Sequence, residues 1–414
     1  MADAGTNLIS WGANSYGQLA CGHTDDVIKP AVHSNWKDDV LCITGGGGHT
    51  AMITDSRELY TCGWNNRGQL GLGDTINRIE LHRVLIPPVK HVSCGWNHTL
   101  AITDTGHLLV FGSNAFGQLG IGRIGWQCTT PTSCEVSPGS CVTDVAAGLR
   151  HSVAVLADGS VWSWGDNKKG QLGCSRERSK KCIPFPVQVS FEGCRGKSIA
   201  VGLHHTVLLT DAGAVYCWGS NQHGQCGASL LQVIQKNPTD ISTNSDPTSN
   251  TESKEPAMKL KIESVPVPMR VRGPLNDACV REIHSGWSHV VVATDQGRVY
   301  TWGRADYGQL GGGDELQQNG HSAEPREVKC LRGVKQLACG AEHSIAISGD
   351  GQVRTWGWNE HGMCGTGDES NVLSPVLVSA VQRSLVMLVG CGSGHSFAVV
   401  KTRLMQDFRD DEKN

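Results

Sequence analysis

Two short motifs each recur seven times along this chain, and they recur in phase. One reads aromatic-Gly-x-Asn-x-x-Gly-Gln-Leu-Gly with modest variation, and the other reads Gly-x-x-His, mostly followed by Ser or Thr. Neighbouring copies lie 49 to 54 residues apart, except for one interval of 84 residues that appears in both series. Similar units of this length are typical of a repeat architecture in which each unit packs on its neighbours. The first motif has its first glycine at Gly12, Gly63, Gly112, Gly165, Gly219, Gly303 and Gly357, and the second ends at His49, His98, His151, His205, His289, His343 and His395.

The residues between the two motifs have the pattern of a β-hairpin. Apolar and polar residues alternate from 343 to 348, an Asp350-Gly351 turn follows, and the alternation resumes from 353 to 357. The same design recurs around Asp158-Gly159. Asp-Gly favours a tight hairpin turn because glycine adopts positive φ without strain. Since no helical period competes with this pattern, each repeat is predicted to be a small antiparallel sheet.

The two ends of the chain complete one unit. Residues 8–12 have the pattern of a second hairpin strand with no first strand before it, and residues 395–400 that of a first strand with no second after it. Each alone would leave an unpaired strand edge, which sheets avoid. Pairing residues 8–11 with 396–400 removes both edges and closes a ring. The sequence therefore predicts an all-β fold, a seven-bladed β-propeller closed by pairing of N- and C-terminal strands.

The interval of 84 residues carries an insertion. Its centre, residues 237–250, is polar and almost free of apolar side chains. Such a segment buries too little apolar area to offset the entropy of ordering it. We therefore predict a single propeller over residues 1–400, a disordered loop at about 230–275 whose part 237–256 proteases cut first, and a loose C-terminal tail over 401–414.

Composition excludes several classes of protein. The 36 basic and 39 acidic residues give a net charge of −3, so the basic footprint of a nucleic-acid-binding protein is missing. No apolar run approaches the ~18 residues of a membrane span, and the first residues lack the pattern of a signal peptide. The 17 cysteines include no C-x-x-C pair, which favours reduced thiols inside the cell. We expect a protein that binds no nucleic acid and does not insert into membranes.

The seven repeated histidines do not indicate a metal site. They fall at the start of equivalent strands in separate repeats, so no two of them belong to one compact cluster, and spacings near 50 match no zinc-ligand pattern. A buried polar group normally has a hydrogen-bond partner. We therefore predict that each imidazole is structural, lies between two blades and bonds to backbone, and that the chain binds no metal.

The chain contains two fragments that resemble nucleotide-binding motifs, but the residues around each fragment do not match the motif. Residues 120–125 match G-x-G-x-x-G, but no helix pattern follows them. Gly196-Lys197-Ser198 resembles the end of a phosphate-binding loop, yet Phe191 occupies the place of its first glycine. No nucleophile–base pair or metalloprotease motif stands out either. We predict no catalytic residue and no cofactor.

Variable positions inside the constant motifs are the candidate binding residues. In a propeller they project from equivalent loops, and exposed Trp, Tyr and Arg dominate interface energies. The repeat at 302–308 also has Ala305 where the other six copies have Asn. Two interpretations stay open: the aromatic residues contact a partner or fold against neighbouring blades, and Arg304 and Asp306 contact a partner or pair within the protein. The candidate partner-binding residues are Trp96, Arg150, Trp287, Ser288, Arg304, Asp306 and Tyr307.

The paired motifs resemble the repeats of the regulator of chromosome condensation family over residues 8 to 400. Residues 9–19, 45–49, 301–311 and 356–365 look most similar to the secretion-linked exchange factors of that family. The resemblance implies a seven-bladed propeller that is a monomer, resides in the cytoplasm and the nucleus, and binds a small GTPase and an exocyst subunit. The chain departs from the founding member, since it has no basic N-terminal tail and no insertion for a β-wedge, so Ran exchange and chromatin binding are not carried over.

These observations lead to one main hypothesis and two rivals. The resemblance implies a guanine nucleotide exchange factor for a small GTPase, linked to the regulation of secretion, which makes no chemical bond. The alternative is a non-catalytic propeller scaffold for protein–protein interaction, for example with exocyst components. A third interpretation, an enzyme that uses the propeller rim, is disfavoured because no catalytic constellation is present.

Overall fold

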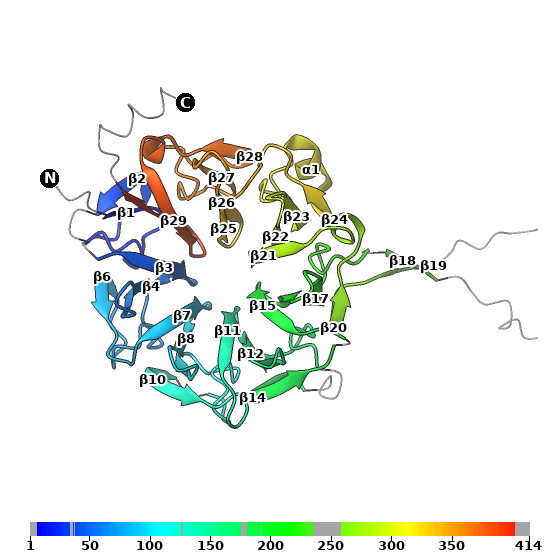
Figure 1. Cartoon of the computed structure of the whole chain (residues 1–414), viewed down its shortest axis with the longest axis horizontal. Coiled ribbons are helices and arrows are strands. Elements are labelled where there is room, and N and C mark those ends of the chain that lie inside the picture. The colour runs from blue at the N-terminus through cyan, green and yellow to red at the C-terminus, as the bar shows by residue number, and fades with distance from the viewer. Residues whose placement is uncertain are drawn as a thin grey trace, which may run out of the picture.

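Seven four-stranded antiparallel sheets form a ring (Figure 1). Their inner strands line a central channel with a volume of about 400 Å³. The computed structural model describes residues 6–33, 36, 38–125, 127–174, 180–191, 193–229, 231–234 and 258–401. The predicted seven-bladed β-propeller is confirmed. Among these residues, no helix is long and apolar enough to cross a membrane.

Each blade runs from an inner strand beside the channel to an outer strand at the rim. We number the blades from the first inner strand along the chain. Blade 1 is β3 (Val40–Gly45), β4 (His49–Thr54), β5 (Leu59–Gly63) and β6 (Arg78–Arg83); blade 2 is β7 (Val89–Cys94), β8 (His98–Thr103), β9 (Leu108–Gly112) and β10 (Cys128–Cys134); blade 3 is β11 (Val142–Ala147), β12 (His151–Leu156), β13 (Val161–Asp166) and β14 (Cys182–Val189); blade 4 is β15 (Gly196–Val201), β16 (His205–Thr210), β17 (Val215–Ser220) and β20 (Ser264–Arg270); blade 5 is β21 (Val280–Ser285), β22 (His289–Thr294), β23 (Val299–Arg304) and β24 (His321–Glu327); blade 6 is β25 (Gln336–Cys339), β26 (His343–Ile347), β27 (Val353–Gly357) and β28 (Val372–Leu377); blade 7 is β29 (Leu385–Cys391), β30 (His395–Lys401), β1 (Thr6–Gly12) and β2 (Val27–His33).

Blade 7 closes the ring with strands from both ends of the chain. Its order is β29, β30, β1 and β2, and the register pairs Leu8 with Val399 and Trp11 with Ser396. This confirms the predicted pairing of residues 8–11 with 396–400. Trp11 is fully buried, and its indole N–H donates to the carbonyl of Met363 in blade 6 at 2.9 Å. The closing strand is therefore bonded both within its sheet and to the preceding blade.

The structure differs from the expected disordered loop at its C-terminal part. Residues 264–270 form β20, the outer strand of blade 4, and Gly273–Leu275 form a short 3-10 helix. The loop was expected from the 84-residue interval and its polar centre, but the interval also contains this outer strand, which tolerates the prolines at 266 and 268 because its free edge needs no donor. Strands β18 (Leu231–Ile234) and β19 (Met258–Lys261) form a separate pair that extends away from the ring (Figure 1). The proposed protease-sensitive segment 237–256 and the tail 402–414 lie outside the described residues.

The seven repeated histidines form a ring of contacts between blades. All seven side chains are fully buried, and each Nε2 lies near a hydroxyl of the next blade. The partner is thus a side-chain hydroxyl, not the backbone group expected from the sequence. The distances are 3.0 Å for His49–Thr99, 3.0 Å for His98–Ser152, 3.2 Å for His151–Thr206, 2.9 Å for His205–Ser285, 3.4 Å for His289–Ser344, 2.9 Å for His343–Ser396 and 2.8 Å for His395–Thr50.

The hydrogen bonds made by these hydroxyls determine which nitrogen of the imidazole carries the proton. Thr99 donates its proton to the carbonyl of Gln69 at 2.8 Å, so it must accept from the Nε2–H of His49. Nδ1 of His49 is then the unprotonated nitrogen, and no polar atom of the described residues lies within bonding distance of it. A charged imidazole would bury a second donor without an acceptor. Burial accordingly lowers the pKa of His49 to about 3.

The glycine of Gly-x-x-His makes room for the histidine. A Cβ atom at Gly148 would lie 2.6 Å from Cε1 of His151, which is far closer than atoms in van der Waals contact approach. The same overlap occurs at Gly340 with His343. The backbone N–H of Gly148 also bonds to the carbonyl of His151 at 2.9 Å. The motif therefore encodes a tight loop in which the backbone of the glycine contacts the imidazole directly and leaves no room for a side chain.

Ser285 compensates for a missing hydroxyl. His289 is followed by Val290 where the other blades carry Ser or Thr, and His205 bonds to Ser285 instead. We expect Ser285→Ala to lower the free energy of unfolding by roughly 1–3 kcal/mol, because it leaves a buried donor without an acceptor. The measurement is urea unfolding followed by tryptophan fluorescence.

The repeat itself supplies the control for this prediction. The double variant Ser285→Ala with Val290→Thr returns the hydroxyl to its usual position and should recover most of the lost stability. A single variant as stable as the parent protein would show that the contact between His205 and Ser285 contributes little.

Candidate functional site: the loop face

One end of the propeller carries both repeated loops. The Gly-x-x-His loops join first to second strands and the aromatic-Gly loops join third to fourth strands, so antiparallel order places both at the same end of each blade. Bonds such as the one from Trp64 N–H to the Gly48 carbonyl, at 2.7 Å, hold the two loops together. We call this end the loop face, and we call the opposite end, with its hairpin turns, the turn face.

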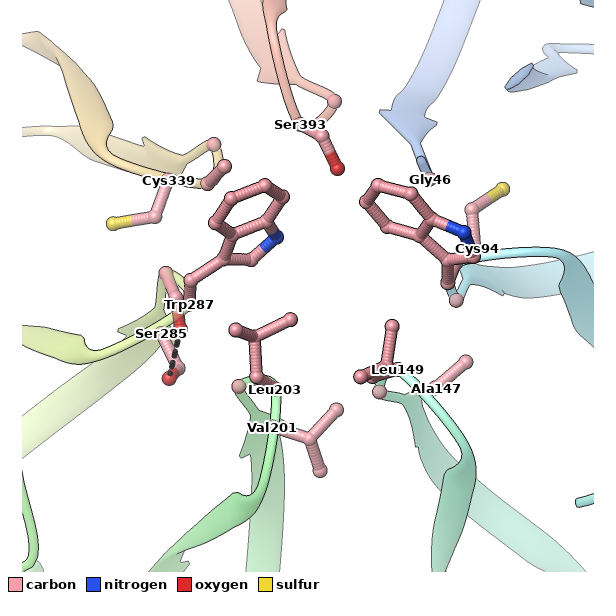
Figure 2. Close-up of a pocket in the computed structure, with 18 of the residues that line it drawn as sticks. Gly46, Cys94, Ala147, Leu149, Val201, Leu203, Ser285, Trp287, Cys339 and Ser393 are labelled. Atoms are coloured by element: carbon pink, nitrogen blue, oxygen red, sulfur yellow. Dashed lines mark hydrogen bonds between the residues drawn. The ribbon is translucent and has the colours of Figure 1, made fainter. Parts of the chain in front are cut away.

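Two tryptophans meet across the mouth of the channel on the loop face. Trp96 comes from the loop before β8 in blade 2, and Trp287 comes from the equivalent loop in blade 5. Their ring centroids are 5.8 Å apart, with the planes tilted by 49°. Figure 2 shows Trp287, Leu149 and Leu203 pointing into the cavity of about 90 Å³ that remains. Both indoles are half-buried, so they pack against each other and still contribute apolar surface to the face.

Arg304 lies in a network between blades 5 and 6. Its Nε donates to Asp306 at 2.7 Å and its Nη1 to Glu342 at 3.3 Å, and its guanidinium carbon lies 4.8 Å from the centre of the Tyr307 ring. Glu342 also accepts from Gln309 at 2.7 Å and is almost completely buried. Burial raises the pKa of Glu342 to about 7, although Arg304 and Gln309 each lower it.

This geometry favours the structural interpretation of Arg304. Its guanidinium pairs with Asp306 of its own loop and with Glu342 of the neighbouring blade, so it holds these blades together. The backbone N–H of Arg304 bonds to the carbonyl of Ser288 at 2.9 Å. The candidate residues here therefore include a structural pair, while the half-buried Trp287 and Tyr307 and the exposed carboxylate of Asp306 remain open to a partner.

The unusual Ala305 has a structural reason. In other blades the Asn at this position bridges its loop, as where Asn14 Nδ2 donates to the carbonyl of His23 at 2.8 Å. In blade 5 the loop instead contains helix α1 (Asp314–Asn319), and the N–H of the buried Ala305 donates to the carbonyl of Gly320 that ends it. The departure reflects a different loop and gives no separate sign of a ligand.

Replacing Arg304 is expected to destabilise the fold. Arg304→Ala leaves Glu342 buried without its cation, so we expect the free energy of unfolding to fall by roughly 1–3 kcal/mol. This differs from the near-zero change that a purely solvent-exposed arginine would give. Asp306→Asn is the control, because the carboxylate of Asp306 is 41% exposed and its ion pair contributes little. Equal stability of Arg304→Ala and the parent protein would contradict the assignment.

Arg150 lies in a different part of the loop face, between blades 2 and 3. Its guanidinium carbon is 4.2 Å from the centre of the Phe116 ring. Trp96 and Leu149 line both the channel mouth and the depression beside Arg150. The candidate residues thus fall into two groups, one around Arg304 and one around Arg150, with the tryptophan pair between them.

Phe116 and Glu342 occupy variable positions of the two motifs, but the sequence did not single them out as candidate residues. Gln309 occupies a repeated position of the aromatic-Gly motif and was not considered. The contacts of all three with Arg150 or with the network of Arg304 are what place them in these groups. As to metals, the described residues contain no cluster of three His, Cys, Asp or Glu side chains able to hold an ion. The cysteines are free thiols, and burial raises the pKa of several, including that of Cys42 to about 11, as expected for packing residues.

Comparison with known proteins places this geometry in a family. The model of the RCC1-like domain matches residues 7–398. The chain is 38% identical to the secretion-regulating guanine nucleotide exchange factor of Mus musculus, covering 95% of this chain and 83% of that protein. It is 35% identical to the protein of the same name from Bos taurus, covering 95% and 82%.

Solved structures show the same fold. Prp20p of Saccharomyces cerevisiae, whose structure is described with its binding properties to Gsp1p and histones, has a TM-score of 0.78 at 23% identity, covering 100% of this chain and 96% of that one. Human WBSCR16 has a TM-score of 0.77 at 21% identity, covering 96% and 100%. With the two repeated motifs in place in all seven blades, the chain belongs to the RCC1-like domain family.

Proposed function

We propose that this chain is a guanine nucleotide exchange factor for a small GTPase. The observation that carries the proposal is the 38% and 35% identity, over 95% of the chain, to two mammalian proteins named as such factors. An exchange factor makes no chemical bond. It binds the nucleotide-free GTPase more tightly than the loaded one, and by linkage it weakens nucleotide affinity by the same factor.

The structure supports a function that depends on binding. Interblade bonds from buried histidines and tryptophans hold the ring, as where Trp164 donates to the carbonyl of Gln118 in the preceding blade at 2.8 Å. The loop face then presents Trp287, Tyr307 and Arg150 from rigid supports. Aromatic and arginine side chains of this kind anchor protein interfaces. A face that keeps its shape loses little entropy on binding, which favours tight capture of one GTPase conformation.

The names of the relatives suggest the setting. Because both mammalian proteins are named for regulation of secretion, we extend the proposal to a role in secretion. The family resemblance noted in the sequence adds an exocyst subunit to the proposal as a second partner. From the resemblance to the family alone, we also propose that the chain is a monomer of the cytoplasm and the nucleus.

A non-catalytic scaffold is the second candidate. The chain is also 30% identical to the ultraviolet-B receptor UVR8 of Arabidopsis thaliana and 31% identical to the human E3 ubiquitin-protein ligase HERC2, of which it covers only 8%. Propellers of this family thus occur in proteins that are not named as exchange factors. A scaffold would bind a GTPase without changing its nucleotide affinity.

One experiment distinguishes the two candidates. A panel of small GTPases is loaded with a fluorescent GDP analogue, and its release into excess GDP is followed with and without the full chain. An exchange factor should accelerate release at least tenfold for one GTPase. A stable complex with unchanged release would favour the scaffold and contradict exchange.

A further inference from the structure

Two positions of the repeat meet between blades 5 and 6 on the loop face, and each of the other blade pairs has the corresponding two positions. One is the residue after the glycine of the aromatic-Gly motif, and the other is the residue before the histidine of the next blade. Arg304 and Glu342 are such a pair and form an ion pair at 3.3 Å. From blade 7 onward the seven pairs are Ala13 with Gly48, Trp64 with Asn97, Ser113 with Arg150, Asp166 with His204, Ser220 with Ser288, Arg304 with Glu342, and Trp358 with Gly394.

In the pair of Ser113 and Arg150, the arginine has no carboxylate at the facing position. Asp166 faces His204, where burial lowers the pKa of the imidazole and the carboxylate of Asp166 raises it. Arg150 faces only Ser113, and both residues line the same depression. The positions that supply a carboxylate between blades 3 and 4 and between blades 5 and 6 supply none between blades 2 and 3.

The surroundings of Arg150 strengthen the positive charge. The ammonium of Lys168 lies 5.8 Å from the centre of the Phe116 ring on which Arg150 stacks, and Lys169 is its neighbour in sequence. Among the described residues, no carboxylate lies within ion-pair distance of the side chains of Arg67, Arg150, Lys168 or Lys169. The nearby carboxylate of Asp166 is fully buried and accepts from Gln171 at 3.1 Å. Among the described residues, four cations thus face one nearby carboxylate, so this part of the loop face carries a net positive charge.

The depression beside Arg150 is large enough for a partner's side chains. Its volume is about 490 Å³, and its walls include Arg67, Phe116, Arg150 and Gln127. On its inner side it reaches Trp96 and Leu149, which belong to the apolar mouth of the channel. A ligand that contacts both the basic wall and the apolar inner side needs carboxylates for the first and an apolar side chain for the second.

We propose that this depression is a docking site for an acidic segment of a partner protein. A carboxylate of that segment takes the place facing Arg150 that Asp166 takes facing His204. The guanidinium of Arg150 donates planar, paired hydrogen bonds to that carboxylate. The ring of Phe116, which stacks against the guanidinium, holds it in position. The assignment goes beyond nucleotide exchange and does not depend on it.

The test uses the full chain and a labelled peptide. The probe is a fluorescein-labelled peptide of four glutamates and two leucines, and its binding is followed by fluorescence anisotropy at 50 mM and 200 mM salt. We expect salt-sensitive binding that Arg150→Gln weakens at least tenfold. The matched control is Arg298→Gln, which removes an exposed arginine on the turn face and should leave binding unchanged.

A second variant tests the reasoning from the repeat. Ser113→Asp places a carboxylate at the position that Asp166 occupies in blade 3, so it should neutralise Arg150 and weaken peptide binding by a similar factor while the Tm stays within a few degrees. No binding at 50 mM salt, or equal weakening by Arg298→Gln, would overturn the proposal. Tighter binding of a labelled single-stranded oligonucleotide than of the peptide would also overturn it, because the site would then recognise phosphate.

Discussion

Lowering the pH from 7.5 to 5.5 is expected to remove most of the stability of this propeller. Burial lowers the pKa of six ring histidines to about 3, and that of His151 well below its usual value of 6.5. Between pH 3 and 6.5 the unfolded chain binds protons at these residues and the folded chain does not. Stability is therefore constant with respect to these groups above pH 6.5 and is lost as the pH falls below it.

The expected size of this effect follows from the number of histidines. Each contributes up to about 1.4 kcal/mol per pH unit, so seven together lower the free energy of unfolding by roughly 5–10 kcal/mol over this range. Glu342 opposes the change, because its raised pKa makes the folded state gain stability as the pH falls from 7 towards 4.5, but it is one group against seven. Urea unfolding at pH 7.5, 6.5 and 5.5 measures the effect. A midpoint that changes little over these three values would show that the imidazoles do not remain neutral in the folded ring.

Trp11→Ala is expected to lower the free energy of unfolding by roughly 3–5 kcal/mol, the usual cost of truncating a buried aromatic side chain. Trp11 is fully buried in β1, which pairs with β30 on one side and β2 on the other. Its loss removes both apolar packing and the bond to Met363 in blade 6. Because this strand closes the ring, deletion of residues 1–12 should abolish cooperative unfolding altogether.

Another repeat provides the matched control for Trp11. Phe111 occupies the equivalent position in blade 2 and is also fully buried. Trp11→Phe should therefore lose clearly less stability than Trp11→Ala in the same urea titration. If both variants were as stable as the parent protein, the closing blade would contribute little to the fold, and the ring-closure account would be wrong.

The sequence predicted the parts of the fold that each repeat encodes locally. The Asp-Gly turns and the alternation around them predicted the hairpins, and the incomplete units at 8–12 and 395–400 predicted how the ring closes. The histidines were correctly predicted to lie between blades, but their partners were not. The hydroxyl that meets the imidazole lies 50 to 55 residues away for five of the seven histidines and 345 residues away for His395. At His205 it comes from Ser285, 80 residues away, because Val290 lacks a hydroxyl.

The candidate site was less predictable because it depends on contacts between repeats. Arg304 was named for its own loop, whereas its role follows from Glu342 in the next blade. The contact between Trp96 and Trp287 joins blades 2 and 5 across the channel. These blades are not neighbours in the ring, so no local sequence pattern predicts the contact. The outer strand β20 was placed in the expected loop because the long interval was treated as one insertion, although an edge strand tolerates the prolines at 266 and 268.

The most direct test of the proposed function is nucleotide release from a responsive GTPase in the presence of face-specific variants. If the loop face binds the GTPase, Trp287→Ala should lower the rate of release at least tenfold at equal concentrations of folded protein, since a central aromatic anchor contributes about 2 kcal/mol or more to binding. Arg298→Gln on the turn face should leave the rate unchanged. The opposite outcome, full exchange by Trp287→Ala, or no acceleration of release for any GTPase by the parent protein, would contradict the account.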